Sequence, residues 1–87
     1  MEENVYVYRE FYIPVRMMGG LRRWVDDHKL PGGFLQAVLE NDLKEACGRA
    51  DDENMRNLPA YVAWLYNEAP ALCWGSKANV WAWEAAK

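Results

Sequence analysis

The sequence predicts a mainly α-helical fold, a compact bundle of about four short helices preceded by an N-terminal β-strand or extended arm. Apolar residues recur at three- and four-residue steps over most of the chain, and Gly and Pro separate these stretches at short intervals. Period-two alternation is confined to the first 13 residues. A length of 87 residues fits one domain, in which residues 1–13 form the strand or arm and residues 14–87 form the helical bundle.

Residues 5–13 form the predicted strand. Val5, Val7 and Ile13 alternate with tyrosines and Glu10, which favours an extended chain. No second segment has a convincing strand pattern, and a lone strand leaves its backbone N–H and C=O groups unpaired. We therefore expect the strand to pair with the same strand of another copy, giving a homodimer or higher homo-oligomer. The alternative is that the segment is an extended arm that lies over the helices, or is partly disordered.

The first predicted helix begins at Pro14, because proline suits the first turn of a helix. Its apolar face includes Met18, Leu21 and Trp24. The pair Gly19-Gly20 interrupts this pattern, at a cost of about 1 kcal/mol per glycine relative to alanine. Close approach of another helix or of a ligand is expected to offset that cost.

The second helix is predicted over about residues 34–48, after a connector rich in Gly and Pro. Asp42 falls in the middle of its apolar stripe, and Asn41 flanks the same face. A carboxylate there must find a partner or stay protonated. Either it caps a neighbouring helix or pairs with an arginine within the fold, or it holds a ligand or partner group.

Two further helices complete the bundle. Asp51 is a predicted N-cap, followed by acidic residues that complement the helix dipole. Beyond it, the chain forms either one helix over 52–68 that is kinked at Pro59, or a short turn with a fresh start near Asn57-Leu58. Ser76 is the predicted N-cap of a last helix over about residues 77–86.

The composition argues against catalysis. The chain has no Thr, one Ser and one His, so a Ser/His/Asp triad is barely possible and a multi-histidine metal site is impossible. The two cysteines form no CxxC pair and are expected to be free thiols in a reducing compartment. We expect no enzyme, no cofactor and no metal.

The charge pattern restricts the partners. The net charge is −3, and the one basic cluster, Arg16 with Arg22-Arg23, is small and is followed by Asp26-Asp27. This disfavours nucleic-acid binding. No apolar run reaches the ~18 residues of a membrane span, and the start of the chain is acidic where a signal peptide is basic. We expect a cytoplasmic protein without membrane association.

Several distinctive runs lie between Tyr12 and Trp83. They include Pro31-Gly32-Gly33-Phe34-Leu35-Gln36-Ala37-Val38-Leu39-Glu40-Asn41-Asp42-Leu43, Arg49-Ala50-Asp51-Asp52-Glu53-Asn54, Trp64-Leu65-Tyr66-Asn67 and Cys73-Trp74-Gly75-Ser76. Over about four-fifths of its length, the chain thereby resembles a family of small proteins encoded by bacteriophages and prophages. The resemblance implies an accessory protein of the infected bacterial cell, of a kind that often counters host defences or regulates host or phage proteins by binding.

Two functions follow as hypotheses. The first is an anti-defence inhibitor that binds a host defence protein or sequesters its nucleotide signal. Aromatic stacking combined with an arginine is a common way to hold a nucleotide, and aromatic residues make up 14% of the chain. The second is a small DNA-associated regulatory or replication accessory protein that uses its three arginines. The candidate binding residues are Tyr12, Arg16, Arg22, Asn41, Asp42, Trp74 and Trp81.

Overall fold

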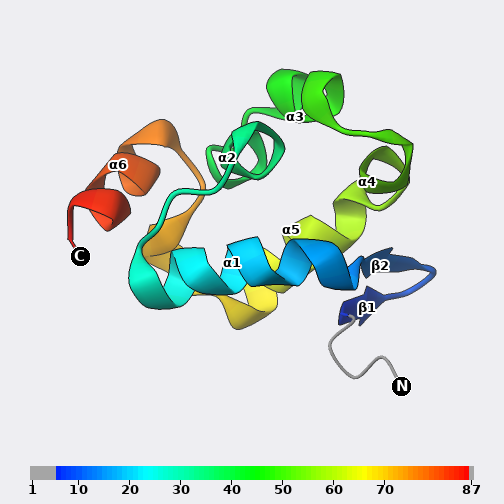
Figure 1. The fold of residues 1–87 in the computed structure, drawn as a ribbon, viewed down its shortest axis with the longest axis horizontal. Coiled ribbons are helices and arrows are strands. Elements are labelled where there is room, and N and C mark those ends of the chain that lie inside the picture. The colour runs from blue at the N-terminus through cyan, green and yellow to red at the C-terminus, as the bar shows by residue number, and fades with distance from the viewer. Residues whose placement is uncertain (1–5, 87) are drawn as a thin grey trace.

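A computed structural model describes residues 6–86 (Figure 1). Within this range the chain forms an antiparallel hairpin, six α-helices and one 3₁₀ turn. The elements are β1 (Tyr6–Tyr8), β2 (Phe11–Ile13), α1 (Val15–Asp27), α2 (Gly33–Leu39), α3 (Leu43–Arg49), α4 (Asp52–Arg56), α5 (Leu58–Glu68), η1 (Ala71–Cys73) and α6 (Lys77–Ala85). The mainly helical class is confirmed. There are six helices where about four were predicted, because two of the predicted stretches are each divided.

The N-terminal segment is a hairpin, so the prediction of one strand over residues 5–13 is wrong. Tyr8 pairs with Phe11 across a two-residue turn at Arg9-Glu10. Arg9 has a φ of 57°, at a turn position that Gly, Asn or Asp usually occupies. We expected a strand of a second copy to pair with this segment. Instead, β1 pairs with β2 of the same chain. This removes the reason for expecting a strand-paired oligomer. The first five residues of the predicted arm lie outside the described residues.

Helix α1 continues without a break through Gly19 and Gly20, with Pro14 at its N-cap. A Cβ atom on Gly20 would lie 3.2 Å from Cδ1 of Leu35 and 3.9 Å from Cβ of Pro31. Glycine is thus explained there by the close approach of α2 and of the connector before it. The expectation of close approach by another helix is confirmed at Gly20, whereas the atoms nearest to a Cβ on Gly19 belong to Arg23 of α1 itself.

The predicted helix over residues 34–48 is divided into α2 and α3. Asn41 lies between them in the left-handed conformation, with a φ of 61°. The next residue, Asp42, is the N-cap of α3, and its Oδ1 accepts a hydrogen bond from the backbone N–H of Glu45 at 3.2 Å. The prediction of Asp42 in the middle of one helix is wrong. Its carboxylate does cap a helix, and that helix is the one that follows it.

Pro59 coincides with a fresh helix start, which was one of the two predicted alternatives. α4 ends at Arg56, and α5 begins at Leu58 with the proline in its first turn. Both predicted side-chain caps are confirmed. Oδ1 of Asp51 accepts from the N–H of Asn54 at 2.8 Å, and Oγ of Ser76 accepts from the N–H of Asn79 at 3.0 Å.

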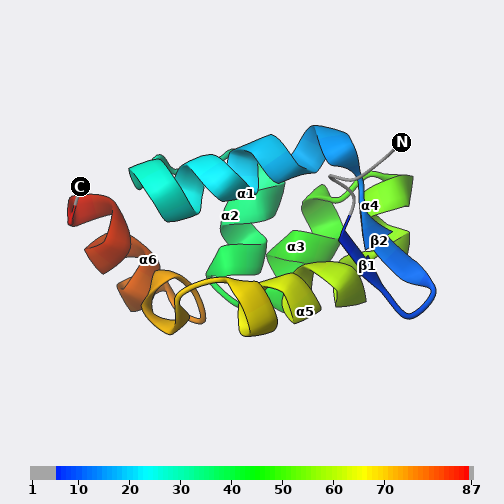
Figure 2. The ribbon, with the colours of Figure 1, turned by 90° about the horizontal axis from the view of Figure 1, so that it is seen from below.

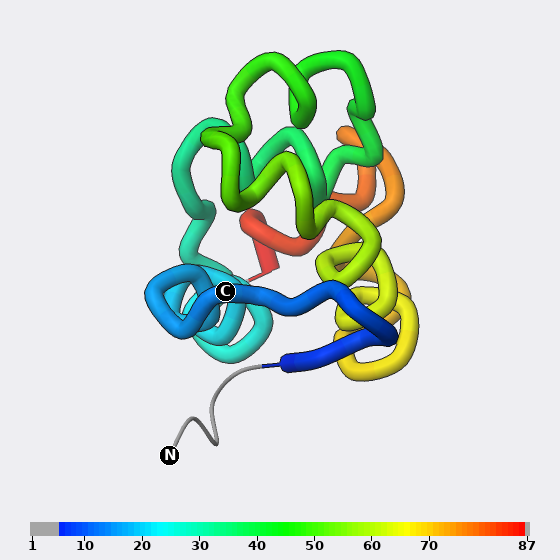
Figure 3. Tube along the Cα trace, turned by 90° about the vertical axis from the view of Figure 1, so that its right-hand side faces the viewer, coloured from blue at the N-terminus to red at the C-terminus, as the bar shows by residue number. Residues whose placement is uncertain are grey.

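Helices α1 and α5 lie along two edges of the molecule, and α2 and α3 lie across one side of them (Figures 2 and 3). The hairpin packs on α5 at one end, and α6 lies at the opposite end (Figure 2). The radius of gyration is 12.1 Å, close to the ~12 Å expected of a compact chain of this length. The largest fully buried side chains are Trp24, Tyr61, Ile13, Leu21, Leu39 and Leu65. None of the helices within residues 6–86 has both the length and the apolar character needed to cross a membrane.

Candidate functional site

Tyr12 and Arg16 belong to a polar network that joins the hairpin and α1 to α4. The hydroxyl of Tyr12 donates to Glu53 at 2.6 Å, and its backbone N–H donates to Oδ1 of Asn57 at 2.9 Å. Nη2 of Arg16 donates to Asp51 at 3.1 Å and to Glu53 at 3.0 Å. The hydrogen bond from the Tyr12 hydroxyl, followed by the one from Arg16, holds the pKa of the Glu53 carboxyl below its ordinary value. These two candidates have contacts within the fold.

Asn41 and Asp42 form the turn between α2 and α3. Asn41 is exposed, and Asp42 is partly buried. Both line a small apolar cavity of about 60 Å³ between α2, α3 and α5. They contribute the polar edge of a surface whose remaining residues are apolar.

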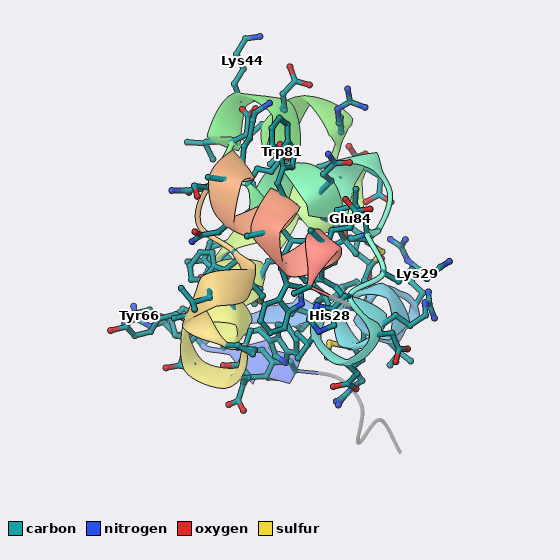
Figure 4. All side chains as sticks on the ribbon, turned by 90° about the vertical axis from the view of Figure 1, so that its left-hand side faces the viewer. His28, Lys29, Lys44, Tyr66, Trp81 and Glu84 are labelled. Carbon is teal, nitrogen blue, oxygen red and sulfur yellow. The ribbon has the colours of Figure 1, made fainter. Side chains whose placement is uncertain are left out.

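None of the described cavities contains two of the other three candidates, Trp74, Trp81 and Arg22. Trp74 is partly buried and packs against the core, whereas Trp81 has 69% of its surface exposed and projects from α6 (Figure 4). Arg22 lines a cavity of about 420 Å³ beside Tyr6 and Trp64, with Asp26 and Glu68 also in its wall. No described cavity contains Arg22 together with another of the seven candidates.

The three arginines do not line one cavity. Arg16 and Arg23 line a groove beside the connector that follows α1. Arg22 lines the other cavity, which lies between α1 and α5. Because consecutive helical residues point about 100° apart, the Arg22-Arg23 pair is divided between two surfaces. This geometry does not favour a continuous arginine patch against a DNA backbone.

Helix α5 carries an exposed apolar surface, and none of the seven candidate residues lies on α5 itself. Its first nine residues, Leu58 to Tyr66, include no charged side chain. One side is buried in the core, yet Val62 is 51% exposed and Tyr66 is 78% exposed. A helix that is apolar all round is normally covered on every side. The absence of charged residues from Leu58 to Tyr66 was visible in the sequence. It could have identified this helix as a candidate binding surface.

Apolar cavities lie on both sides of Val62. The small cavity toward α3 includes Leu43, which is 70% exposed, and the other, of about 400 Å³, is lined by Tyr8 and Tyr66. Asp42 is the one charged residue among those that line the two cavities, and its carboxylate caps α3. We call this surface the α5 face. Its members are Tyr8, Leu43, Leu58, Pro59, Val62 and Tyr66.

The described residues contain few groups placed for chemistry. In residues 6–86, no three His, Cys, Asp or Glu side chains are grouped as metal ligands. Burial raises the pKa of the Cys73 thiol to about 11, which keeps it protonated at neutral pH. Nδ1 of His28 is hydrogen bonded to the carbonyl oxygen of Trp83 at 2.6 Å.

Comparison of the chain with protein-family models, with curated proteins and with solved structures finds no match. The resemblance to phage-encoded proteins stays a prediction.

Proposed function

We propose that this chain is a non-enzymatic binding protein that docks onto a protein partner through the α5 face. The observation that carries the proposal is the exposure of Val62 and Tyr66 on a helix that has no charged residue from Leu58 to Tyr66. Contiguous exposed apolar surface marks interaction sites in soluble proteins, and aromatic residues without charges are typical of the centre of such sites.

The class of partner that we propose follows from the resemblance to phage-encoded proteins. Small accessory phage proteins often act on host proteins by binding, so we propose that the partner is a host defence protein and that the bound chain inhibits it. Tyr66 is the principal anchor in this proposal, because large exposed rings contribute most of the binding energy in many interfaces. Val62 lines the same cavity as Tyr66, and Leu43 lines the cavity on the other side of Val62.

Capture from host cells tests the docking. The tagged protein is compared with Tyr66→Glu and with Leu72→Glu, which adds the same charge at a side chain that is 72% exposed and lies outside the α5 face. We expect Tyr66→Glu to lose the captured protein, since an unpaired charge buried at an interface costs about 3–5 kcal/mol. Leu72→Glu is expected to retain it, and circular dichroism is expected to show that both variants are folded.

The inhibitory role has its own test. In a strain that carries the defence protein captured in this way, the parent and Leu72→Glu are expected to restore phage infection, and Tyr66→Glu is expected not to. Retention of the captured protein by Tyr66→Glu would contradict docking at this face. Sedimentation gives a further outcome: a mass of about twice 10.1 kDa that returns to 10.1 kDa in Tyr66→Glu would assign the face to a second copy instead.

A further inference from the structure

A second surface, distinct from the α5 face, collects positive charge. A groove of about 370 Å³ lies between α1 and the connector that leads into α2. Arg16 and Arg23 of α1 line it, together with Lys29 of the connector, and no carboxylate is among its lining residues. Figure 4 shows Lys29 and Tyr66 at opposite edges of the molecule. Ligands at the two surfaces therefore do not compete for space.

The path of the chain explains the groove. The left-handed conformation of His28, with a φ of 57°, ends α1 and turns the chain back along the helix. The connector then passes over Gly20, where the missing side chain lets Pro31 and Leu35 approach closely. On the other wall, Nη1 of Arg23 lies 3.2 Å from the position that a Cβ atom on Gly19 would take. The two glycines thus leave room both for the connector and for the guanidinium.

The three cations of the groove differ in whether carboxylates pair with them. Arg16 is paired with Asp51 and Glu53 through Nη2. In the part of the chain that the structure describes, neither Arg23 nor Lys29 forms an ion pair or a side-chain hydrogen bond. Positive groups that line one concave surface raise the local concentration of anions, even though the protein as a whole carries a net charge of −3.

Four apolar residues, Met17, Leu30, Pro31 and Leu35, also line the groove, and Leu35 belongs to the core. We call this apolar part of the lining the floor. A simple inorganic anion would meet the cations and leave this floor in contact with water. A ligand that has both a phosphate and a flat apolar ring matches both parts, and the volume lies at the lower end of the ~300–1,000 Å³ typical of small-molecule sites.

We propose that this groove binds a nucleotide, with the phosphate at Arg23 and Lys29 and the base against Met17, Leu30 and Pro31. Arg16 also lines the groove, but its charge is offset by Asp51 and Glu53, so Arg23 and Lys29 are the two cations assigned to the phosphate. The site goes beyond the proposed docking function and does not depend on it. It also differs from the seven candidate residues of the sequence analysis, of which it contains Arg16 alone.

Calorimetric titration tests the site with four probes: 5′-AMP, 5′-GMP, inorganic phosphate and adenosine. We expect at least one of the two nucleotides to bind at low salt and to bind more weakly as salt increases, because charged contacts are screened. Phosphate is expected to bind more weakly than that nucleotide, and adenosine is expected not to bind. Absence of binding by both nucleotides at low salt would overturn the proposal. Equal binding of phosphate and nucleotide would overturn the assignment of the base to the floor.

Arg22 provides a matched control. Arg23→Gln and Arg22→Gln remove the same charge from adjacent positions, but only Arg23 lines the groove. We expect Arg23→Gln to weaken nucleotide binding at least tenfold and Arg22→Gln to change it less than twofold. Lys29→Gln, on the exposed connector, is expected to match Arg23→Gln. Equal losses in Arg22→Gln and Arg23→Gln would indicate general attraction by the surface and would overturn the site.

Discussion

Cys73 shows how burial of a single group makes stability depend on pH. Its side chain is fully buried, and its carbonyl oxygen accepts a hydrogen bond from the indole N–H of Trp24 at 2.9 Å. Burial disfavours the thiolate and raises the pKa of this thiol to about 11, from an ordinary value of 9.0. Below pH 9 the thiol is protonated in both the folded and the unfolded chain, so its contribution to stability is complete there.

The free energy of unfolding is therefore predicted to decrease between pH 9 and pH 11, where the unfolded chain releases the Cys73 proton and the folded chain retains it. Urea unfolding at pH 8, 9, 10 and 11 measures this decrease. Cys73→Ala is expected to show a shallower decrease over the same interval, whatever its stability at pH 8. A variant that loses stability with pH as steeply as the parent would show that another group is responsible. Tyr61, whose burial also raises its pKa, contributes at the upper end of this range.

At the scale of elements, the helix boundaries divide into those with a strong sequence signal and those with a weak one. Asp51, Pro59 and Ser76 mark helix starts because their side chains satisfy or avoid unpaired backbone N–H groups, which is a local property. The break at residues 40–42 has no Gly or Pro, and the apolar spacing continues across it. Its local signal is Asn41, which tolerates the left-handed conformation, followed by Asp42 as an N-cap, and this signal is weaker than that of Gly or Pro. The hairpin turn at Arg9-Glu10 has none of the Gly, Asn or Asp residues that usually mark such a turn.

Asn41 carries the break between α2 and α3, because its φ of 61° directs the chain out of α2. Asn41→Ala is predicted to lower the free energy of unfolding by about 1 kcal/mol, since the left-handed conformation costs roughly 1–2 kcal/mol for a residue with a Cβ atom and no compensating side chain. Asn41→Gly is predicted to stay within about 0.5 kcal/mol of the parent, because glycine adopts this conformation freely. Chemical denaturation measures both. An equal loss in the two variants would show that the Asn41 side chain matters more than its backbone.

At the scale of the whole molecule, both candidate surfaces depend on contacts between distant segments. The α5 face combines α5 with α3 and β1, and the groove combines α1 with the connector that returns along it. The uncharged composition of α5 was visible in the sequence, but which of its sides stays uncovered depends on the packing. For Arg23 and Lys29, the sequence shows that both side chains are positive but not that they line the same groove. The candidate residues were therefore chosen by type, and four of the seven, Tyr12, Arg16, Asp42 and Trp74, have structural contacts.

Trp83 connects α6 to the C-terminal end of α1. The ring of Trp83 stacks on that of His28, with centroids 4.4 Å apart. Its indole N–H donates to the carbonyl oxygen of Trp24 at 2.9 Å. Val80 is the one buried residue of α6, whereas α5 has five buried residues. Because local stability follows buried apolar contacts, α6 is expected to open more readily than α5.

Trp83→Phe tests this attachment, because it keeps a ring for the stack with His28 and removes the N–H donor. The carbonyl oxygen of Trp24 still accepts from the backbone N–H of His28 at 3.1 Å, so the predicted loss of stability is modest, about 0.5–1.5 kcal/mol. Hydrogen exchange is expected to become faster for amides of α6 and to change little for those of α5. Trp81→Phe, two residues away and 69% exposed, is the control and is expected to alter neither helix. Equal acceleration in both helices would instead show that α6 and α5 open as one cooperative unit.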